Sequence, residues 1–154
     1  MPDTPTLYEW AGGDEAFGRL TEALYRLVPD DPLLAPVFAG MGPEHPAHVA
    51  AWLAEVFGGP ARYTEELGGY RAMLAHHFGL AITPEQRARW VVLLSEAADV
   101  SGLPDDPEFR SALVAYAEWG TRLAMANSAS GADPPSDAPT PRWGWGEAPP
   151  YRPG

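Results

Sequence analysis

The chain has 154 residues, of which 45% are hydrophobic, and its 21 acidic and 10 basic side chains give a formal net charge of -11. This length supports one domain with a single sizeable core, and the acidic balance argues against nucleic acid or an acidic membrane surface as a partner. Cysteine is absent, which excludes disulfides, thiolate metal sites and cysteine nucleophiles. The first ten residues do not have the pattern of a secretory signal, and no apolar run has the length of a membrane span, so we expect a cytoplasmic protein.

The hydrophobic spacing predicts an all-α chain. In chain order, the predicted helices cover residues 14–28, 32–38, 46–57, 70–77, 83–100 and 107–125. The helix at 83–100 has the clearest start, since Thr83 as N-cap is followed by Pro84 and, three residues after the cap, by Gln86. No segment alternates with a period of two over a useful length, so we expect no sheet.

The composition changes near residue 127. From Asn127 onward the chain is dense in Pro, Gly and Ser and lacks the apolar content for a core of its own. We therefore divide the chain into a folded domain, residues 1–126, and a C-terminal extension, residues 127–154. The extension contains Trp143, Trp145 and Tyr151. It is either a disordered tail or an extended strap whose aromatic side chains dock on the domain.

The four histidines form two pairs, His45/His48 and His76/His77. Positions 70, 73, 74 and 77 share one face of a helix, and this face is apolar except for its histidine. His77 is therefore predicted to point inward, and His76 lies off this face. A neutral imidazole on an apolar face suits a metal or a haem iron. A core histidine bonded to a backbone carbonyl gives the same pattern.

Several motifs together resemble the group II truncated haemoglobins, which are bacterial globins with two-over-two helical packing. The matching features are GG at 12–13, ALYRLV at 23–28, FGGPARY at 57–63, the spacing from His77 to Trp90, and YAEWG at 116–120. The resemblance covers residues 7 to about 128. It implies a truncated globin fold, a two-over-two helical sandwich around haem b (iron protoporphyrin IX), with an irregular Pro- and Trp-rich tail outside the family pattern.

The resemblance also implies roles for individual residues. His77 would be the proximal iron ligand through its Nε2 atom, with its other ring nitrogen bonded to a backbone carbonyl. Tyr25 and Trp90 would direct a hydroxyl and an indole N–H at the distal ligand. Phe38 would pack flat against the porphyrin.

The distal gate and the proximal ligand each have more than one candidate residue. Counting back from the GGP triplet makes His45 the distal gate, with Val49 one turn later against the iron. Counting forward from Phe38 makes Pro46 the gate, and His48 is a further candidate for a propionate or solvent. On the proximal side, counting from Gly68 gives His76 and counting back from Trp90 gives His77. The helical face favours His77.

The remaining pocket candidates are implied with less support. Tyr63, Met73 and Phe78 are expected to contact the haem, and Arg62 and Arg71 to pair with its propionates. Each has an ordinary alternative, in packing or as a solvated charge. A small-metal site built from the two histidine pairs would require the segments 46–57 and 70–77 to meet without haem between them, which the aromatic lining disfavours.

The implied function is binding of O2, NO, CO, cyanide or sulfide at an open sixth position on the iron. Distal hydrogen bonds on the order of 1–3 kcal/mol each would slow oxygen release, which favours O2/NO redox chemistry over oxygen storage. We therefore expect NO-dioxygenase-like or peroxidase-like turnover with an external reductase, in a monomer or homodimer. The alternative is a haem-based sensor or partner-binding module without turnover, in which the Pro- and Trp-rich tail is recognised.

Overall fold

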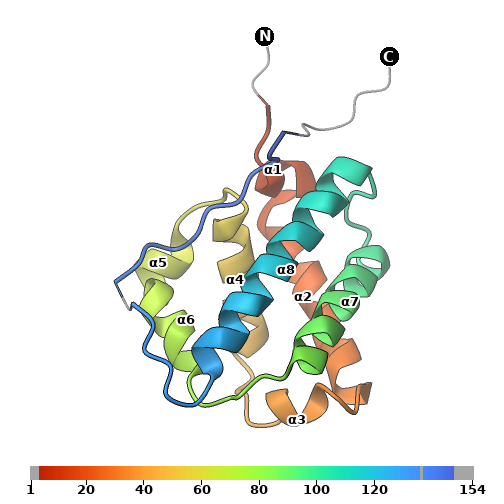
Figure 1. Ribbon diagram of the computed structural model, residues 1–154. Coiled ribbons are helices and arrows are strands. Elements are labelled where there is room, and N and C mark those ends of the chain that lie inside the picture. Colours follow the sequence, from red (N-terminus) through yellow and green to blue (C-terminus); the bar gives the residue numbers. More distant parts are fainter. Residues whose placement is uncertain (1–3, 136, 148–154) are drawn as a thin grey trace.

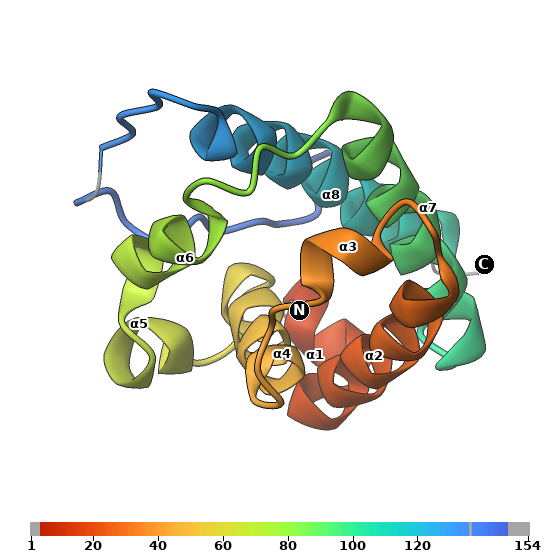
Figure 2. The ribbon, with the colours of Figure 1, turned by 90° about the horizontal axis from the view of Figure 1, so that it is seen from below.

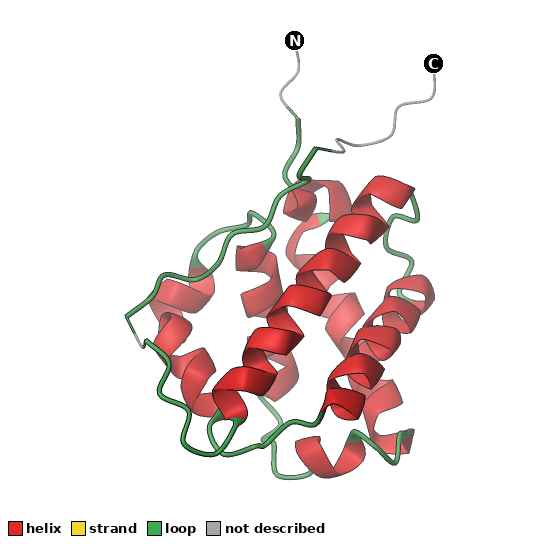
Figure 3. Ribbon diagram, viewed as in Figure 1, coloured by secondary structure: helices red, strands yellow, loops and turns green. Residues whose placement is uncertain are grey.

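A computed structural model describes residues 4–135 and 137–147, and every regular element in these ranges is helical (Figure 3). The elements are α1 (Leu7–Ala11), α2 (Gly13–Leu27), the 3₁₀ turn η1 (Val28–Asp30), α3 (Ala35–Phe38), α4 (His45–Val56), α5 (Arg62–Glu66), α6 (Gly69–His77), α7 (Pro84–Val100) and α8 (Pro107–Ser128). The all-α prediction is confirmed, and the long helices begin and end within a few residues of their predicted limits.

Four long helices form two packed pairs. Helix α2 packs against α4 and α7, and α7 packs against α8. Figure 1 and Figure 2 show α2 with α4 and α7 with α8, while the short helices α3, α5 and α6 complete the sides. The core between the layers is apolar, and its largest fully buried side chains are Tyr63, Phe17, Phe57, Phe109, Leu7, Leu20, Leu24, Leu34, Leu53, Leu93, Leu94 and Leu113.

The start of α7 follows its sequence signal. The backbone N–H of Gln86 donates to Oγ1 of Thr83 at 3.1 Å, and the backbone N–H of Thr83 donates to Oε1 of Gln86 at 2.9 Å. This reciprocal capping box satisfies two N–H groups that would otherwise lack partners, and losing such a cap costs about 1 kcal/mol. The predicted cap is confirmed.

Two short helices, α1 and α5, were not predicted. Each has five residues, too few to show a helical period. A local signal for α1 was nevertheless present, because Thr6 and Glu9 form a second capping box. Helix α5 has no side-chain cap, so no such local signal marks it.

The glycines of the FGGP segment let α1 approach the end of α4. Gly58 has φ +104°, which side-chain-bearing residues rarely adopt, and a Cβ there would lie 2.8 Å from Cβ of Thr6. A Cβ on Gly59 would lie 2.7 Å from the backbone oxygen of Ala54. The backbone N–H of Tyr8 donates to the carbonyl of Phe57 at 2.8 Å across this contact. The two glycines are therefore required by close packing.

Residues 137–147 dock on the helices. We call residues 137–147 the strap; it runs along α5 and the end of α4 toward α1 (Figure 1). The backbone N–H of Trp143 donates to the carbonyl of Val56 at 2.8 Å, and Arg142 donates to the carbonyls of Glu55 and Gly59. The indole of Trp145 donates to the carbonyl of Pro5 at 2.7 Å.

The docked alternative is therefore confirmed for both tryptophans of the strap, whereas Tyr151 lies outside the described residues. Helix α8 continues to Ser128, beyond the predicted Met125, where the Ser128 hydroxyl and carbonyl accept the N–H groups of Ile82 and Ala81. The division of the chain at residue 126 stays a prediction.

Candidate functional site

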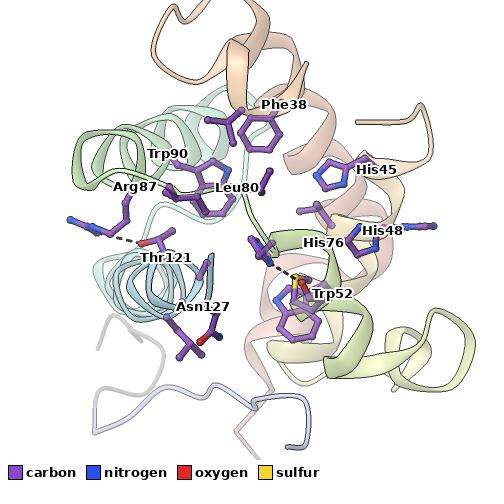
Figure 4. A pocket seen from close by; sticks show the side chains of 18 of the residues that line it. Phe38, His45, His48, Trp52, His76, Leu80, Arg87, Trp90, Thr121 and Asn127 are labelled. Carbon is purple, nitrogen blue, oxygen red and sulfur yellow. Dashed lines mark hydrogen bonds between the residues drawn. The ribbon is translucent and has the colours of Figure 1, made fainter. Parts of the chain in front are cut away.

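A large apolar cavity lies between the helical layers. The space between its side chains is about 1280 Å³, including the part open to solvent, and residues of every helix from α2 to α8 contribute to its lining. Figure 4 shows this cavity with side chains converging from several helices. The predicted site residues that line it are Tyr25, Phe38, His45, Val49, Tyr63, Met73, His77 and Trp90.

His77 is half-buried at the end of α6 and lines the cavity. Its Nδ1 atom lies 2.8 Å from the backbone oxygen of Met73, one turn earlier. A carbonyl only accepts, so Nδ1 carries the proton and Nε2 keeps its lone pair. Burial lowers the pKa of His77, against the opposing effect of the bond to Met73, so the ring is neutral at pH 7. A neutral histidine with a free Nε2 is the form that ligates metals.

The neighbouring histidine differs in its surroundings. His76 is exposed, although it contributes to the cavity lining. Within the described residues its side chain has no hydrogen-bond partner that would fix the ring. The apolar helical face thus separates the two neighbours in the way that the sequence predicted.

Tyr25 projects from α2 into an aromatic cluster. Its ring centroid lies 5.6 Å from that of Phe38 and 5.5 Å from that of His45, both edge to face. Burial raises the pKa of Tyr25 far above its ordinary value, so it keeps its hydroxyl proton. In residues 4–135 and 137–147, neither the Tyr25 hydroxyl nor the Trp90 indole has a hydrogen-bond partner. Two donors thus remain available to a bound ligand.

The two histidine pairs do approach one another, contrary to the sequence argument. The ring centroid of His76 lies 6.3 Å from that of His45 and 6.3 Å from that of His48. Even so, no group of His, Asp or Glu side chains in the described part of the chain could hold a metal ion by itself. Burial, followed by the charges of the other histidines, lowers the pKa of His45 to about 4 against the opposing charge of Glu44, so His45 is neutral at pH 7.

Three predicted contacts, Phe78, Arg62 and Arg71, do not line the cavity. Helix α6 ends at His77, and Phe78 turns into extended backbone, where it is 77% exposed. Arg62 is half-exposed and pairs with Asp14, with its Nη1 at 3.4 Å from the carboxylate. Arg71 lies on the exposed surface of α6. Phe78 points outward because α6 ends just before it, and Arg62 points toward a nearby carboxylate. The spacing of residues along the sequence shows neither the end of that helix nor that partner.

The structure adds polar residues that the sequence reasoning missed. Arg87 lines the cavity one turn before Trp90 on α7, and its Nη1 donates to Glu118 at 3.1 Å and to Thr121 at 3.3 Å (Figure 4). Its spacing of three residues from Trp90 was a usable signal. Trp52 and Tyr116 also line the cavity, where the Trp52 indole donates to the Tyr116 hydroxyl at 2.8 Å.

This arrangement fits a flat, largely apolar group that carries a metal. The walls are mainly apolar or aromatic, one neutral histidine presents an unshared electron pair, and the donors of Tyr25 and Trp90 have no partner among the described residues. Those are the surroundings that haem iron requires on its proximal and distal sides. Two helical pairs around such a cavity define a globin of the two-over-two type.

Comparisons with known proteins identify the family. Residues 6–118 match the family model described as bacterial-like globin. The chain is 33% identical over 91 residues to the group 2 truncated hemoglobin YjbI of Bacillus subtilis, which covers 59% of this chain and 68% of that protein. The group II truncated hemoglobin of Bacillus anthracis superposes with a TM-score of 0.72 at 26% identity, covering 84% of this chain and 98% of that one. A hemoglobin of Chloroflexus aurantiacus gives 0.69 at 30% identity, with coverages of 79% and 98%.

The chain therefore belongs to the bacterial-like globin family and has the fold of the group II truncated haemoglobins. Membership implies a haem that binds small gaseous ligands such as O2. None of the described helices combines the length and the apolar character needed to cross a membrane.

Proposed function

We propose that the cavity holds haem b, with Nε2 of His77 as the only protein ligand to its iron. The observation that carries this proposal is the bond between Nδ1 of His77 and the carbonyl of Met73, because it leaves Nε2 unprotonated in an apolar cavity. The chain has no cysteine, so the porphyrin is held without thioether bonds. Phe38, Val49, Tyr63 and Met73 supply apolar walls, and we leave Arg62, Arg71 and Phe78 out of the proposed site.

The sixth position is then open to O2, NO or CO. Tyr25 and Trp90 each direct a donor that has no partner within the described ranges toward a ligand with partial negative charge, and neutral His45 lies beside Tyr25 at the same wall. Each such hydrogen bond stabilises the bound ligand by about 1–3 kcal/mol. Since two or three of them would hold O2 for long periods, the pocket suits chemistry on the ligand better than oxygen delivery.

We infer that this chemistry is O2/NO redox turnover, either NO detoxification or peroxidase-like. The haem, when bound, would supply a redox-active iron that holds the ligand and relays electrons to it. The protein's residues orient that ligand, donate hydrogen bonds to it and exclude water from the apolar walls. Conversion of NO and O2 to nitrate takes one electron per turnover, which a partner reductase must supply, and we place the protein in the cytoplasm as a monomer or homodimer.

Absorption spectra of the haem-reconstituted protein test the proposal. The wild type should show a Soret band and a five-coordinate ferrous spectrum, which His77→Ala should lose. His76→Ala is the matched control, since it removes the same ring one residue away, and it should keep the wild-type spectrum. A wild type without a Soret band would refute the proposal, and loss of the ferrous spectrum in His76→Ala alone would transfer the ligand role to His76.

A further inference from the structure

Aromatic side chains form a continuous path from the cavity to the surface. Trp52 and Tyr116 line the cavity and share a hydrogen bond. The Tyr116 ring lies 5.6 Å from that of Trp143 and 6.1 Å from that of Trp119. Trp143 and Trp119 are themselves 5.6 Å apart at an interplanar angle of 35°. We call these four residues the aromatic path.

The path begins in the core and ends in solvent. Tyr116 is only 6% exposed, whereas Trp119 is 42% exposed. Trp143 comes from the strap and bridges the outer end, where its backbone bond to Val56 holds it in place. The strap therefore adds a second connection between Tyr116 and Trp119, beside their direct contact.

We propose that the aromatic path conducts single electrons from a reductant at Trp119 to the cavity, so that the protein reduces hydrogen peroxide with donors too large to enter. The proposal rests on the haem of the proposed function. Tryptophan and tyrosine are the side chains in this cysteine-free chain that lose one electron most readily, and electron transfer between neighbouring rings is fast. One peroxide takes two electrons and two protons and leaves as two water molecules. Two phenolic donors each lose one electron and one hydroxyl proton and leave as phenoxyl radicals.

The charge around Trp119 selects the class of donor. Its neighbour Glu118 pairs with both Arg87 and Arg122, so one positive charge remains in this cluster, whereas the whole chain carries -11 and repels anions at long range. Neutral phenols and hydroquinones should therefore be used in preference to sulfonated, anionic donors.

The experiment compares free hydroquinone with hydroquinone attached to a long polyethylene glycol chain, using the haem-loaded protein and peroxide. Trp119→Phe should lower turnover of the tethered donor by about an order of magnitude, and Trp143→Phe should lower it less, because Tyr116 and Trp119 also contact each other directly at 6.1 Å. Both variants should leave turnover of the free donor, which enters the cavity, unchanged. Trp145→Phe is the matched control: it lies on the same strap but contacts Trp10, away from the path. This variant should behave as wild type with both donors.

A second measurement does not depend on turnover. Freeze-quench electron paramagnetic resonance after one equivalent of peroxide should show a tryptophanyl radical in the wild type and in Trp145→Phe, and peptide mapping should find oxidation at Trp119 and Trp143. In the double variant, in which both Trp119 and Trp143 are replaced by Phe, oxidation should be confined to Trp52 and Tyr116, the inner members of the aromatic path. Equal turnover of the tethered donor in all variants, or oxidation confined to residues off the path, overturns this inference while the Soret band persists. Absence of the Soret band overturns the proposed function and the inference with it.

Discussion

The hydrogen bond between Trp52 and Tyr116 offers a quantitative test of the cavity wall. Tyr116→Phe removes only the hydroxyl that accepts the Trp52 indole N–H at 2.8 Å. Both residues are buried, at 7% and 6% exposed, so the indole loses its partner without gaining water. An unsatisfied buried donor costs about 1–3 kcal/mol. Burial raises the pKa of Tyr116 to about 12, although the bond from Trp52 opposes this shift, so the hydroxyl is uncharged at pH 7. The variant therefore loses a hydrogen bond between two neutral groups, and we expect a cost in the lower half of that range.

The assay is urea unfolding of the haem-loaded protein at fixed protein and haem concentrations, followed by circular dichroism. Trp52→Phe and the double variant complete a thermodynamic cycle, in which the coupling free energy between positions 52 and 116 should be about 1 kcal/mol. Tyr70→Phe is the matched control, because the Tyr70 hydroxyl has no hydrogen-bond partner among the described residues. Its free energy of unfolding should stay within about 0.5 kcal/mol of wild type.

Strict additivity of Trp52→Phe and Tyr116→Phe would refute the reasoning. The reasoning would also be refuted if Tyr70→Phe lowered the free energy of unfolding as much as Tyr116→Phe. Removal of any hydroxyl at the cavity would then carry the same cost.

Three further predictions follow from individual contacts. Tyr25→Phe should speed O2 release about 5- to 150-fold, the equivalent of 1–3 kcal/mol, as measured by stopped-flow absorbance; an unchanged rate would exclude Tyr25 as a ligand donor. The hydrogen bond from Arg89 is the chief cause that lowers the pKa of Asp31, so the unfolded state binds more protons and the protein loses stability as the pH drops below about 5. Asp31→Asn should reduce this loss, measured as melting temperature against pH. Parallel curves of melting temperature for wild type and variant would contradict the prediction. Gly59→Ala would place a Cβ 2.7 Å from a backbone oxygen of α4 and should cost about 1–3 kcal/mol in thermal unfolding, whereas Gly40→Ala, with nothing within 4 Å, should be tolerated; equal effects would show that the contact relaxes.

Local sequence patterns determined the helices and one face of the site. The capping box at Thr83 and the glycine and proline breaks placed the helix ends, because these signals act within one turn of the chain. The same periodicity separated His77 from His76, since residues that recur at helical spacing must share a surface. The motif spacing then connected His77 with Tyr25 and Trp90, and all three do line one cavity.

Tertiary structure decided the features that depend on contacts between distant segments. The meeting of His45 and His48 with His76 and the docking of the strap both join residues that are far apart in the chain. No local period records such contacts. Polar side chains were the hardest to assign, as Arg62 and Arg87 show: one pairs with Asp14 outside the cavity, and the other, with a side chain only 12% exposed, lines it. A flexible charged side chain takes its direction from the partner that the fold brings within reach, whereas an apolar face is fixed by the helix itself.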